Sequence, residues 1–560
     1  MAAAQVLASS VRYIRHRPEL TATWFAILTY LAATLLGVCL ALYIFPIHFL
    51  FPRGTDGPFA TDFAQHVIGQ RYFIADAWRW PLLDIPILNR PDGANVGFTD
   101  SIPLLALVLK LLAPLLPAGF QGIGLWYGIC WIAQPIAAVW CVRASGETRV
   151  VPALCMAVVA VSIPAWLNRF VHVALSSHFL LLFGLGTYFI LVRRGGALRW
   201  AAAAGLLCIT LLVHPYLFVM NAAIVFAAPL TLLVRNDKAW HASLGYAAGT
   251  LLVMMVVLRT LGYLDVTGEG GYGAYAMNLL SPVWPAGSWW LAAMLKPIPM
   301  PSAGTWGWEG YNYLGLGIIV GLLVILMIPR AAWAIVSSHS GIVIVLFGLT
   351  MLALSNQIAI GHLHFENVYP APATLEQFRS SGRFFWPVTY ALALYVVLTI
   401  GRLRSQRSSL LLLTLVGGLQ FTDAAALRND LASRLSAPSP PWSVDASALR
   451  PILESHRFLV VLPRFDCIPR LPDLHIQPSM KMEMDILTLA SETAIPTNTM
   501  YLARWHTRRS CDDAASAQAQ LRPGEVRVLL PGVQDALLPL VPGEENICRR
   551  VGLLAVCTSD

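Results

Sequence analysis

The chain has 560 residues, of which 57% are hydrophobic and only 12% are charged. Soluble domains usually carry about 25% charged residues, so most of this chain is expected to lie in lipid. The net charge of +8 does not indicate nucleic-acid binding. The basic residues form short clusters between apolar runs, which is the positive-inside pattern of membrane loops.

The first apolar run follows Arg12, Arg15 and Arg17. It extends from Trp24 to Phe45 and is longer than the roughly 7–15 apolar residues of a cleavable signal peptide. We therefore predict an uncleaved signal anchor whose N-terminus is cytoplasmic.

The remaining apolar runs predict a polytopic helical membrane protein. A helix needs about 20 apolar residues to cross roughly 30 Å of hydrocarbon. This length predicts about eleven spans in all. They are expected near residues 22–45, 121–142, 150–167, 174–192, 199–213, 216–234, 241–261, 311–329, 340–360, 384–401 and 408–423.

Basic loops set the predicted orientation of these spans. With the N-terminus inside, every short cytoplasmic loop is basic, whereas the alternating outer loops carry little charge. The chain is thus expected to be a multi-pass protein of a bacterial inner membrane, with its C-terminal domain in the periplasm. The basic loops hold Arg143 and Arg149; Arg193, Arg194 and Arg199; Arg235 and Lys238; Arg330; and Arg402, Arg404 and Arg407.

Residues 101–118 (SIPLLALVLKLLAPLLPA) are apolar but are not counted as a span. The segment is bracketed by prolines and contains Lys110. Counting it as a span would place all later arginine clusters outside. We predict a juxtamembrane helix on the outer face, with the Lys110 ammonium reaching toward the interface.

The chain is therefore predicted to be mainly α, with a small C-terminal α/β domain. Residues 1–423 form the membrane domain, whose long outer loops are 51–120 and 262–310; 424–442 form a linker; and 443–560 form the periplasmic domain, with strands at 458–462, 500–505 and 526–530. Outside the cytoplasm, its four cysteines would form two disulfides, and three pairings are open. They are Cys467, Cys511, Cys548 and Cys557.

Candidate catalytic residues occur in the first long outer loop. From Thr61 onward a helix is predicted, with Asp62 and His66 four residues apart on one face. A carboxylate beside an imidazole suits general-base work or metal binding; a helix cap and a surface histidine are the alternative. Asp100 is either an N-cap or a second acid facing the same cavity. Apolar residues of this helical region are expected to face the membrane, namely Phe63, Val67, Tyr72 and Trp78.

Four segments of the chain resemble a known family. TDFAQHVIGQRYF, GFTDSIPLLALVLKLLAPLLP, YGAYAMNLLSP and FRSSGRFFWP are similar to an uncharacterised bacterial family near the GT-C superfamily of polyprenyl-phosphate-sugar-dependent glycosyltransferases. The resemblance implies that Asp62, with Asp56 as the weaker candidate, acts as catalytic base or metal ligand. The second short outer loop, LNRFVHVALSSH, departs from the superfamily by offering Arg169, His172 and His178 in place of paired acids.

The resemblance also implies a substrate and its binding groups. The predicted function is transfer of a sugar from a polyprenyl-phosphate carrier to a glycan, lipid or protein acceptor during modification of envelope glycans. The protein is expected to contact membrane lipid and no nucleic acid; no cofactor is assigned, and a divalent metal is left open. Candidates for binding the lipid phosphate or the substrate are Lys110, Arg169, His172, Tyr272, Glu309, Arg379 and Arg383.

Two other functions remain open: a flippase or transporter of lipid-linked sugars, and a non-enzymatic envelope assembly protein. A transporter would need polar groups along its path, but the predicted membrane interior holds almost no ionisable residues.

Overall fold

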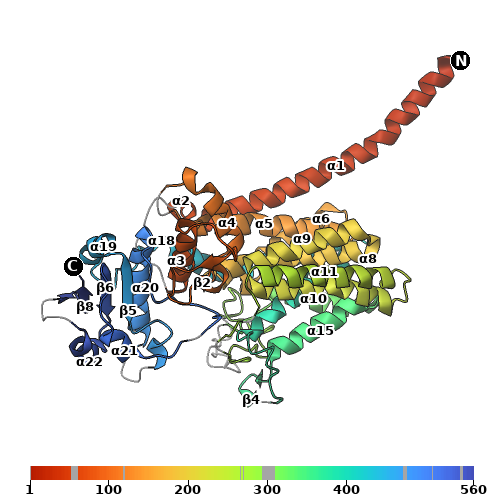
Figure 1. Ribbon diagram of the computed structural model, residues 1–560. Coiled ribbons are helices and arrows are strands. Elements are labelled where there is room, and N and C mark those ends of the chain that lie inside the picture. The colour runs from red at the N-terminus through yellow and green to blue at the C-terminus, as the bar shows by residue number, and fades with distance from the viewer. Residues whose placement is uncertain are drawn as a thin grey trace.

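A helical membrane domain and a small α/β domain form the molecule (Figure 1). The computed structural model describes residues 2–51, 61–117, 120–264, 266–268, 270–292, 309–366, 368–470, 476–507, 509–542 and 547–559. The helices of the membrane domain are α1 (Ala2–Ile44), α2 (Ile47–Leu50), α3 (Thr61–Ala75), α4 (Pro103–Leu112), α5 (Ile123–Ala144), α6 (Val150–Ala160), α7 (Pro164–Leu167), α8 (Phe179–Arg194), α9 (Ala197–Val213), α10 (Pro215–Val234), α11 (Trp240–Thr260), α13 (Leu316–Leu326), α14 (Pro329–Ser338), α15 (Ser340–Leu354), α16 (Trp386–Gly401), α17 (Gln406–Asp423) and α18 (Ala425–Ser436).

Among the described residues, six helices are long and apolar enough to cross a membrane. A seventh candidate is the pair α13 and α14, bent by 104° at its break. The predicted count of about eleven spans is therefore not confirmed. Other predicted spans fall on helices that are apolar but short: α6, for example, ends at Ala160 after 11 residues, which at 1.5 Å per residue is about half of the hydrocarbon thickness.

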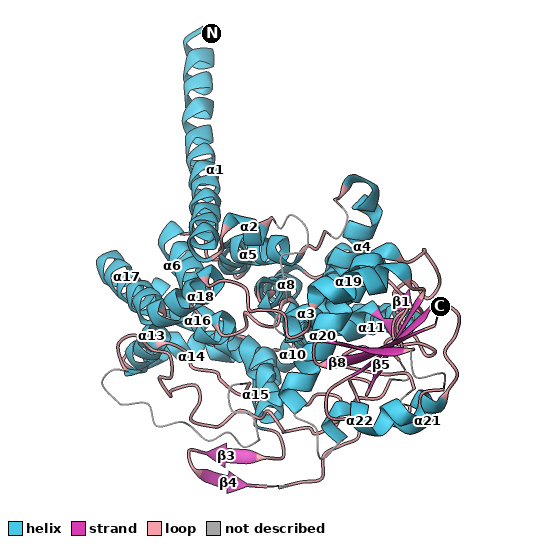
Figure 2. Ribbon diagram, turned by 90° about the vertical axis from the view of Figure 1, so that its left-hand side faces the viewer, coloured by secondary structure: helices cyan, strands magenta, loops and turns pink. Residues whose placement is uncertain are grey.

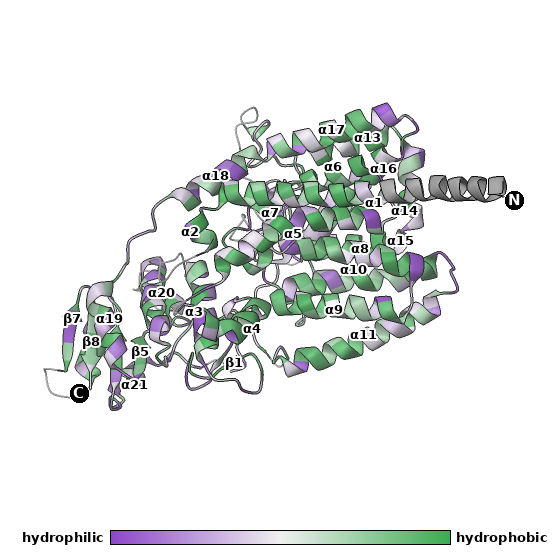
Figure 3. Cartoon of the chain, turned by 90° about the horizontal axis from the view of Figure 1, so that it is seen from above, coloured by the Kyte–Doolittle hydropathy of each residue, from purple (hydrophilic) through white to green (hydrophobic). Residues whose placement is uncertain are grey.

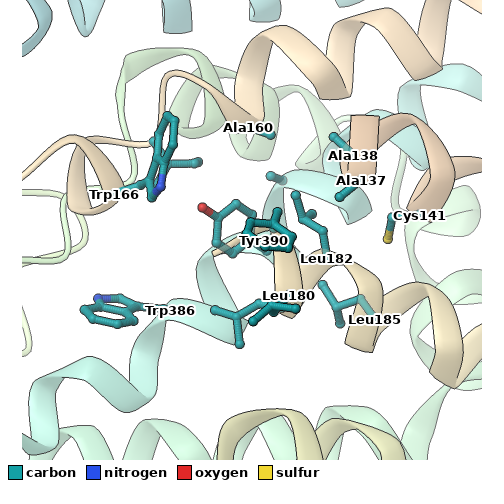
Figure 4. Close-up of a cluster of buried hydrophobic side chains, with 14 of the residues drawn as sticks. Ala137, Ala138, Cys141, Ala160, Trp166, Leu180, Leu182, Leu185, Trp386 and Tyr390 are labelled. Carbon is teal, nitrogen blue, oxygen red and sulfur yellow. The ribbon is translucent and has the colours of Figure 1, made fainter. Parts of the chain in front are cut away.

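The middle of the bundle is apolar, as the hydropathy colouring in Figure 3 shows. Helix α5 packs against α1, α6 and α8, and α10 packs against α8, α9 and α15. Few polar groups lie among these helices. One of them is the hydroxyl of Tyr390, which accepts a hydrogen bond from Gln134 at 2.7 Å and lies 3.0 Å from Nδ1 of His178. Figure 4 shows Tyr390 among the apolar side chains of Leu180 and Leu182.

The two ends of the bundle differ. At one end, here called the basic end, the arginine-rich loops contact one another: Arg193 donates to the carbonyl of Ala144, and Arg235 donates to that of Ser338. The opposite end, here called the distal end, carries the C-terminal domain (Figure 1). Helix α4 with its following turn covers Pro103–Leu115 and is shorter than a span, so it does not cross the membrane by itself.

The C-terminal domain is a mixed sheet with helices on both faces. Its strand order is β5-β6-β8-β7, with β5 and β6 parallel and the other pairs antiparallel. Alternate side chains face opposite sides: Leu459 and Val461 pack toward α19 and α20, while Leu462 packs toward α21 and α22. The elements are α19 (Ala446–Ser455), β5 (Phe458–Leu462), α20 (Ile476–Thr493), α21 (Asp513–Gln518), β6 (Glu525–Leu529), α22 (Gln534–Leu537), β7 (Cys548–Val551) and β8 (Leu554–Thr558).

The cysteines of this domain pair as Cys467–Cys511 and Cys548–Cys557. The second disulfide joins the neighbouring strands β7 and β8, a hairpin that was not predicted. The predicted linker 424–442 begins with helix α18.

Two sequence-based expectations were wrong because the two domains pack together. The predicted strand 500–505 lies outside the sheet; its backbone instead pairs with the membrane domain, where Ala503 N donates to Phe98 O at 2.7 Å. Helix α3 does not face the membrane. It packs against α20, and the Tyr72 hydroxyl donates to Ile495 O at 2.6 Å. Phe63 and Val67 are buried within the protein as well, and Trp78 lies beyond the end of α3.

Two short hairpins complete the distal end. Strands β1 (Asp84–Ile85) and β2 (Ala94–Asn95) pair within the first long loop. Strands β3 (Ile358–Ile360) and β4 (Leu363–Phe365) project from the bundle after α15 (Figure 2).

Candidate active site

A cavity of about 670 Å³ lies at the distal end, between the membrane domain and the C-terminal domain. Side chains from five outer segments of the membrane domain line it, together with residues of the C-terminal domain. One wall is apolar and formed by α9, α10 and α11, through Leu211, Phe218 and Leu258. The remaining walls carry most of the charged groups that the sequence had singled out.

Asp62 lies in the first turn of α3 and its carboxylate faces the cavity. Burial raises the pKa of Asp62 above its ordinary value, and the nearby negative charges of Asp100 and Glu309 raise it further, while His172 and Arg383 oppose this. A carboxyl group with a raised pKa is a stronger base once it is ionised. This environment therefore suits a general base.

Asp100 follows the 3-10 turn Val96–Thr99 and has φ 52°, in the left-handed region. Aspartate is one of the few residues that adopt this conformation. The ring of His66 holds the conformation in place, because its Nδ1 lies 2.5 Å from the Asp100 carbonyl oxygen. The backbone thus directs the Asp100 carboxylate into the cavity rather than toward α4, and Asp100 is not the N-cap of that helix, a position held by Ile102.

The Asp100 carboxylate is surrounded by positive and hydrogen-bonding groups. Its Oδ1 lies 3.8 Å from Nε2 of His214, whose Nδ1 accepts a hydrogen bond from Tyr216 N. Burial by itself would raise the pKa of Asp100, but the neighbouring histidines, His214 first, and Arg383 lower it below its ordinary value. Burial lowers the pKa of His214 to about 3, so this histidine is neutral at pH 7. The pKa values of the two aspartates of the cavity are therefore shifted in opposite directions. The shift favours the protonated form of Asp62 and the ionised form of Asp100.

Glu309 also lines the cavity, and its carboxylate contacts three basic side chains. Arg383 donates to both carboxylate oxygens, through Nη2 to Oε1 at 2.9 Å and Nε to Oε2 at 3.1 Å. Arg169 donates to Oε2 at 2.6 Å, and His172 Nε2 lies 3.0 Å from Oε1. Glu309 is 2% exposed and Arg169 is fully buried. Two arginines share one glutamate, so this wall keeps a net positive charge next to the cavity.

Glycine residues allow these chain segments to meet. A Cβ on Gly382 would lie 2.9 Å from both the Gly310 Cα and the Tyr275 carbonyl oxygen. Asn312 joins the same two glycines, because its side-chain amide donates to the carbonyls of Gly310 and Gly382. This close packing sets Glu309 and Arg383 opposite each other.

Most of the predicted site residues are brought together. Asp62, Asp100, His172, Glu309, Arg379 and Arg383 line the cavity. His66 and Arg169 lie behind this surface, where they hold Asp100 and Glu309 in place. Asp56 lies outside the described residues.

Two predicted residues lie elsewhere. Lys110 donates to Ala77 O at 3.2 Å and its ammonium lies 4.1 Å from the Phe73 ring centre, so it is enclosed by the first loop and does not line the cavity. Tyr272 is 4% exposed, and its hydroxyl donates to Leu352 O, at the end of a membrane helix.

Other cavity residues were not predicted. His214 lies between α9 and α10, Tyr216 lies in the first turn of α10, and Tyr263 follows α11. Gln477, Tyr501 and Arg504 come from the C-terminal domain. The only signal in the sequence was the position of His214 at the predicted outer end of a span. The other residues reach the cavity through the packing of the two domains.

Among the described residues, the carboxylates and histidines of the cavity do not bring three ligand atoms together as closely as a metal site requires. His172 binds Glu309, and His214 uses Nδ1 to accept a backbone hydrogen bond, so its Nε2 carries the proton. Among the described residues, one group of three has its ligand atoms close enough for a metal: Asp466, Cys467 and Cys511. Its two cysteines form a disulfide. Dependence on a divalent metal stays a prediction.

The sequence matches a known protein family over most of its length. Residues 34–425 match the family described as Domain of unknown function (DUF6311), and residues 448–559 match its C-terminal domain. The chain belongs to this family. Membership of an uncharacterised family was expected from the sequence and is confirmed. No curated protein matches the sequence.

Solved structures similar to this DUF6311 protein include the oligosaccharyltransferase of Archaeoglobus fulgidus. Its apo form has 11% identity and a TM-score of 0.47, covering 92% of this chain and 71% of that one. The form tethered to an acceptor peptide has 11% identity and a TM-score of 0.43, covering 83% of this chain. The DUF6311 chain spans 63% of the length of that tethered structure. The complex with an inhibitory peptide and a dolichol-phosphate has 11% identity and a TM-score of 0.43, covering 85% and 65%. Each of these is a likeness of structure alone and says nothing of this chain's activity.

Proposed function

We propose that this DUF6311 protein is a membrane glycosyltransferase that moves a sugar from a polyprenyl-phosphate carrier to an acceptor hydroxyl at the distal face. One observation carries the proposal: a single cavity combines two aspartates of opposite pKa shift with an arginine-bearing wall and an apolar wall. Separation of the pKa values of two acids is typical of sites that carry out acid–base chemistry.

The proposed chemistry is a displacement at the anomeric carbon of the sugar. Asp62 accepts the proton of the acceptor hydroxyl as the oxygen forms a bond to that carbon. The bond from the carbon to the phosphate oxygen breaks, and the electron pair leaves with the lipid phosphate. The positive wall around Arg383 stabilises the charge that develops on this phosphate. Protonated Asp62 then returns its proton to solvent.

The remaining groups position the two substrates. Asp100 stays ionised and offers a fixed negative charge for the acceptor or for the positive charge that develops on the sugar ring. The apolar wall of Leu211, Phe218 and Leu258 suits the first units of an isoprenoid chain. The outward side of α11 is exposed and apolar, with Leu251 and Leu252 among its residues, so the lipid would reach this wall from the membrane.

The proposal places the distal end in the periplasm, following the basic loops at the opposite end. The acceptor would then be a glycan, lipid or protein outside the cytoplasm. Sugar and acceptor identity are left to experiment.

The test uses the purified full-length protein in lipid nanodiscs with a radiolabelled polyprenyl-phosphate sugar. Transfer of label to an envelope fraction, or its slow release to water, is expected. Binding of the carrier without loss of its sugar, over hours and with acceptor present, would contradict the enzymatic assignment. Movement of an intact carrier between leaflets in reconstituted vesicles would point to a flippase instead.

A further inference from the structure

Arg504 belongs to the C-terminal domain but lies in the cavity. It follows Ala503, whose backbone pairs with Phe98, and precedes Trp505, whose N donates to Thr267 O at 3.0 Å. The chain is therefore held on both sides of Arg504 by the membrane domain. Its guanidinium packs against the backbone of Gly268 so closely that a Cβ there would lie 3.2 Å from Nε. These contacts fix where the guanidinium lies.

The described hydrogen bonds of the Arg504 guanidinium are to backbone carbonyls. Its Nη1 donates to Ala503 O at 2.5 Å and its Nη2 donates to the carbonyl of Gln377. No carboxylate among the described residues forms an ion pair with it. A guanidinium has five N–H donors, and two carbonyls leave several of them for a ligand.

Arg504 and Arg383 act on the same part of the cavity. Both are close enough to influence the phenol of Tyr216 electrostatically, and the Arg383 guanidinium lies 5.0 Å from the centre of the Tyr216 ring. Arg383 comes from the start of a membrane helix, whereas Arg504 comes from the other domain. The two cations thus line one cavity from different domains.

We propose that Arg504 is a phosphate-binding residue, supplied by the C-terminal domain to the phosphate group of the lipid carrier. This inference rests on the proposed function. Arg383 has its forked face occupied by Glu309 and contributes mainly charge. In the part of the chain that the structure describes, Arg504 has no carboxylate partner, and it offers its N–H groups directly to phosphate oxygens. The C-terminal domain then contributes a residue to the site that binds the sugar donor.

The experiment measures binding of undecaprenyl phosphate and of undecaprenol, which lacks the phosphate, to full-length protein in nanodiscs. The variants are Arg504→Ala and Arg504→Lys, and the matched control is Arg549→Ala, an exposed arginine on strand β7 of the same domain. Arg504→Ala is expected to weaken undecaprenyl phosphate binding about tenfold or more, because a charged hydrogen-bond partner is lost. Undecaprenol binding should stay within about twofold. Arg504→Lys should fall between, since lysine keeps the charge but not the fork. Arg549→Ala should change neither.

The outcomes separate this inference from the proposed function. Equal binding of undecaprenyl phosphate by wild type and Arg504→Ala overturns the inference alone. An equal loss for both lipids also overturns it, because the effect would then concern the fold or the chain of the lipid. Wild-type protein that binds undecaprenyl phosphate no better than undecaprenol overturns both. If Arg504→Ala does not fold, Arg504→Lys carries the same test, and unchanged binding by that folded variant would overturn the role of the fork.

Discussion

Two buried glutamates, one at the cavity and one in the C-terminal domain, have opposite charge states. Glu309 is 2% exposed and Glu483, on α20, is 0% exposed. Burial favours the neutral acid at both sites. At Glu309 the positive charges of Arg169 and Arg383 outweigh burial and hold its pKa well below the ordinary value. At Glu483 burial dominates and raises the pKa to about 8, although a hydrogen bond from the Thr499 hydroxyl at 2.6 Å opposes it.

The comparison shows that charged partners, and not burial alone, decide whether an acid is ionised. The same rule separates the aspartates of the cavity. Asp100 has histidines and Arg383 close by and its pKa is lowered, whereas burial prevails at Asp62 and raises its pKa. Asp62 thus resembles Glu483 in its environment, but it faces the cavity, where the proposed acceptor hydroxyl would give up its proton to it.

The largest expected effect comes from removing the proposed base. Asp62→Asn should lower transfer from the labelled carrier about 10³-fold, because general-base catalysis typically contributes 10²- to 10⁴-fold. Thermal stability should be unchanged or slightly higher, since the buried charge is gone. Asp84→Asn is the matched control, an aspartate of the same loop on β1 that does not line the cavity. Full activity in Asp62→Asn would exclude Asp62 as the base.

Removing the negative charge of Glu309 should mainly lower the stability of the folded protein. Glu309→Gln leaves two buried arginines without their carboxylate, and removal of one partner of a buried ion pair costs about 3–5 kcal/mol. We expect a clear fall in the unfolding temperature of the purified protein in detergent. Glu366→Gln, at an exposed turn after β4, is the control. A stability equal to wild type would show that the cluster does not hold the charges described here.

The neutral glutamate gives a pH-dependent effect of smaller size. The folded pKa of Glu483 is about 8 and its ordinary value is 4.5, so the folded state binds the proton more tightly. Stability of the C-terminal domain is then greatest below the ordinary value and falls as pH rises toward 8, by about 1.4 kcal/mol per pH unit. Glu483→Gln should remove this slope, as measured by hydrogen exchange of β5 and β6 at pH 5 and pH 8. The exposed Glu454→Gln should keep it, and an unchanged slope in Glu483→Gln would mean that another group titrates.

The smallest expected effect is that of replacing His214, as measured in the pH profile of transfer. The rate should fall below the raised pKa of Asp62 by about tenfold per pH unit, because only the ionised base is active. His66 and His214 have their pKa lowered by burial to about 4 and about 3 and remain neutral between pH 5 and pH 8. His214→Gln should therefore lower the rate modestly and leave the acidic limb at wild-type pH. If the acidic limb of the pH profile moves in His214→Gln, the group whose titration sets that limb is His214 and not Asp62.

Hydropathy and charge predicted much of the fold but not the number of spans. The long apolar runs correspond to helices, and the shortest polar loops between them are basic. The span count is not confirmed, because hydropathy measures apolar residues without distinguishing contact with lipid from contact with protein. Helix α6 shows this: it is apolar because it is buried against α5, α16 and α17, and its 11 residues are too few to cross the membrane.

The candidate site was predicted in its residue types but not in its pairs. Asp62, Asp100, Glu309 and Arg383 were all expected on outer loops because an apolar bundle leaves charged groups only at its ends. The ion pairs of Glu309 join residues 140 and 74 positions away in the chain. Local patterns carry no information on contacts across such separations.

The sequence by itself determined that this is a helical membrane protein with basic loops at one end and reactive side chains at the other. Those properties follow from composition and from the length of apolar runs, which are local. Only the tertiary structure decided that Glu309 is ionised between two arginines, that Asp62 has a raised pKa, and that Arg504 of the second domain enters the cavity. Charge states and shared sites depend on which groups meet in space and on how much water remains between them, and both are set by packing.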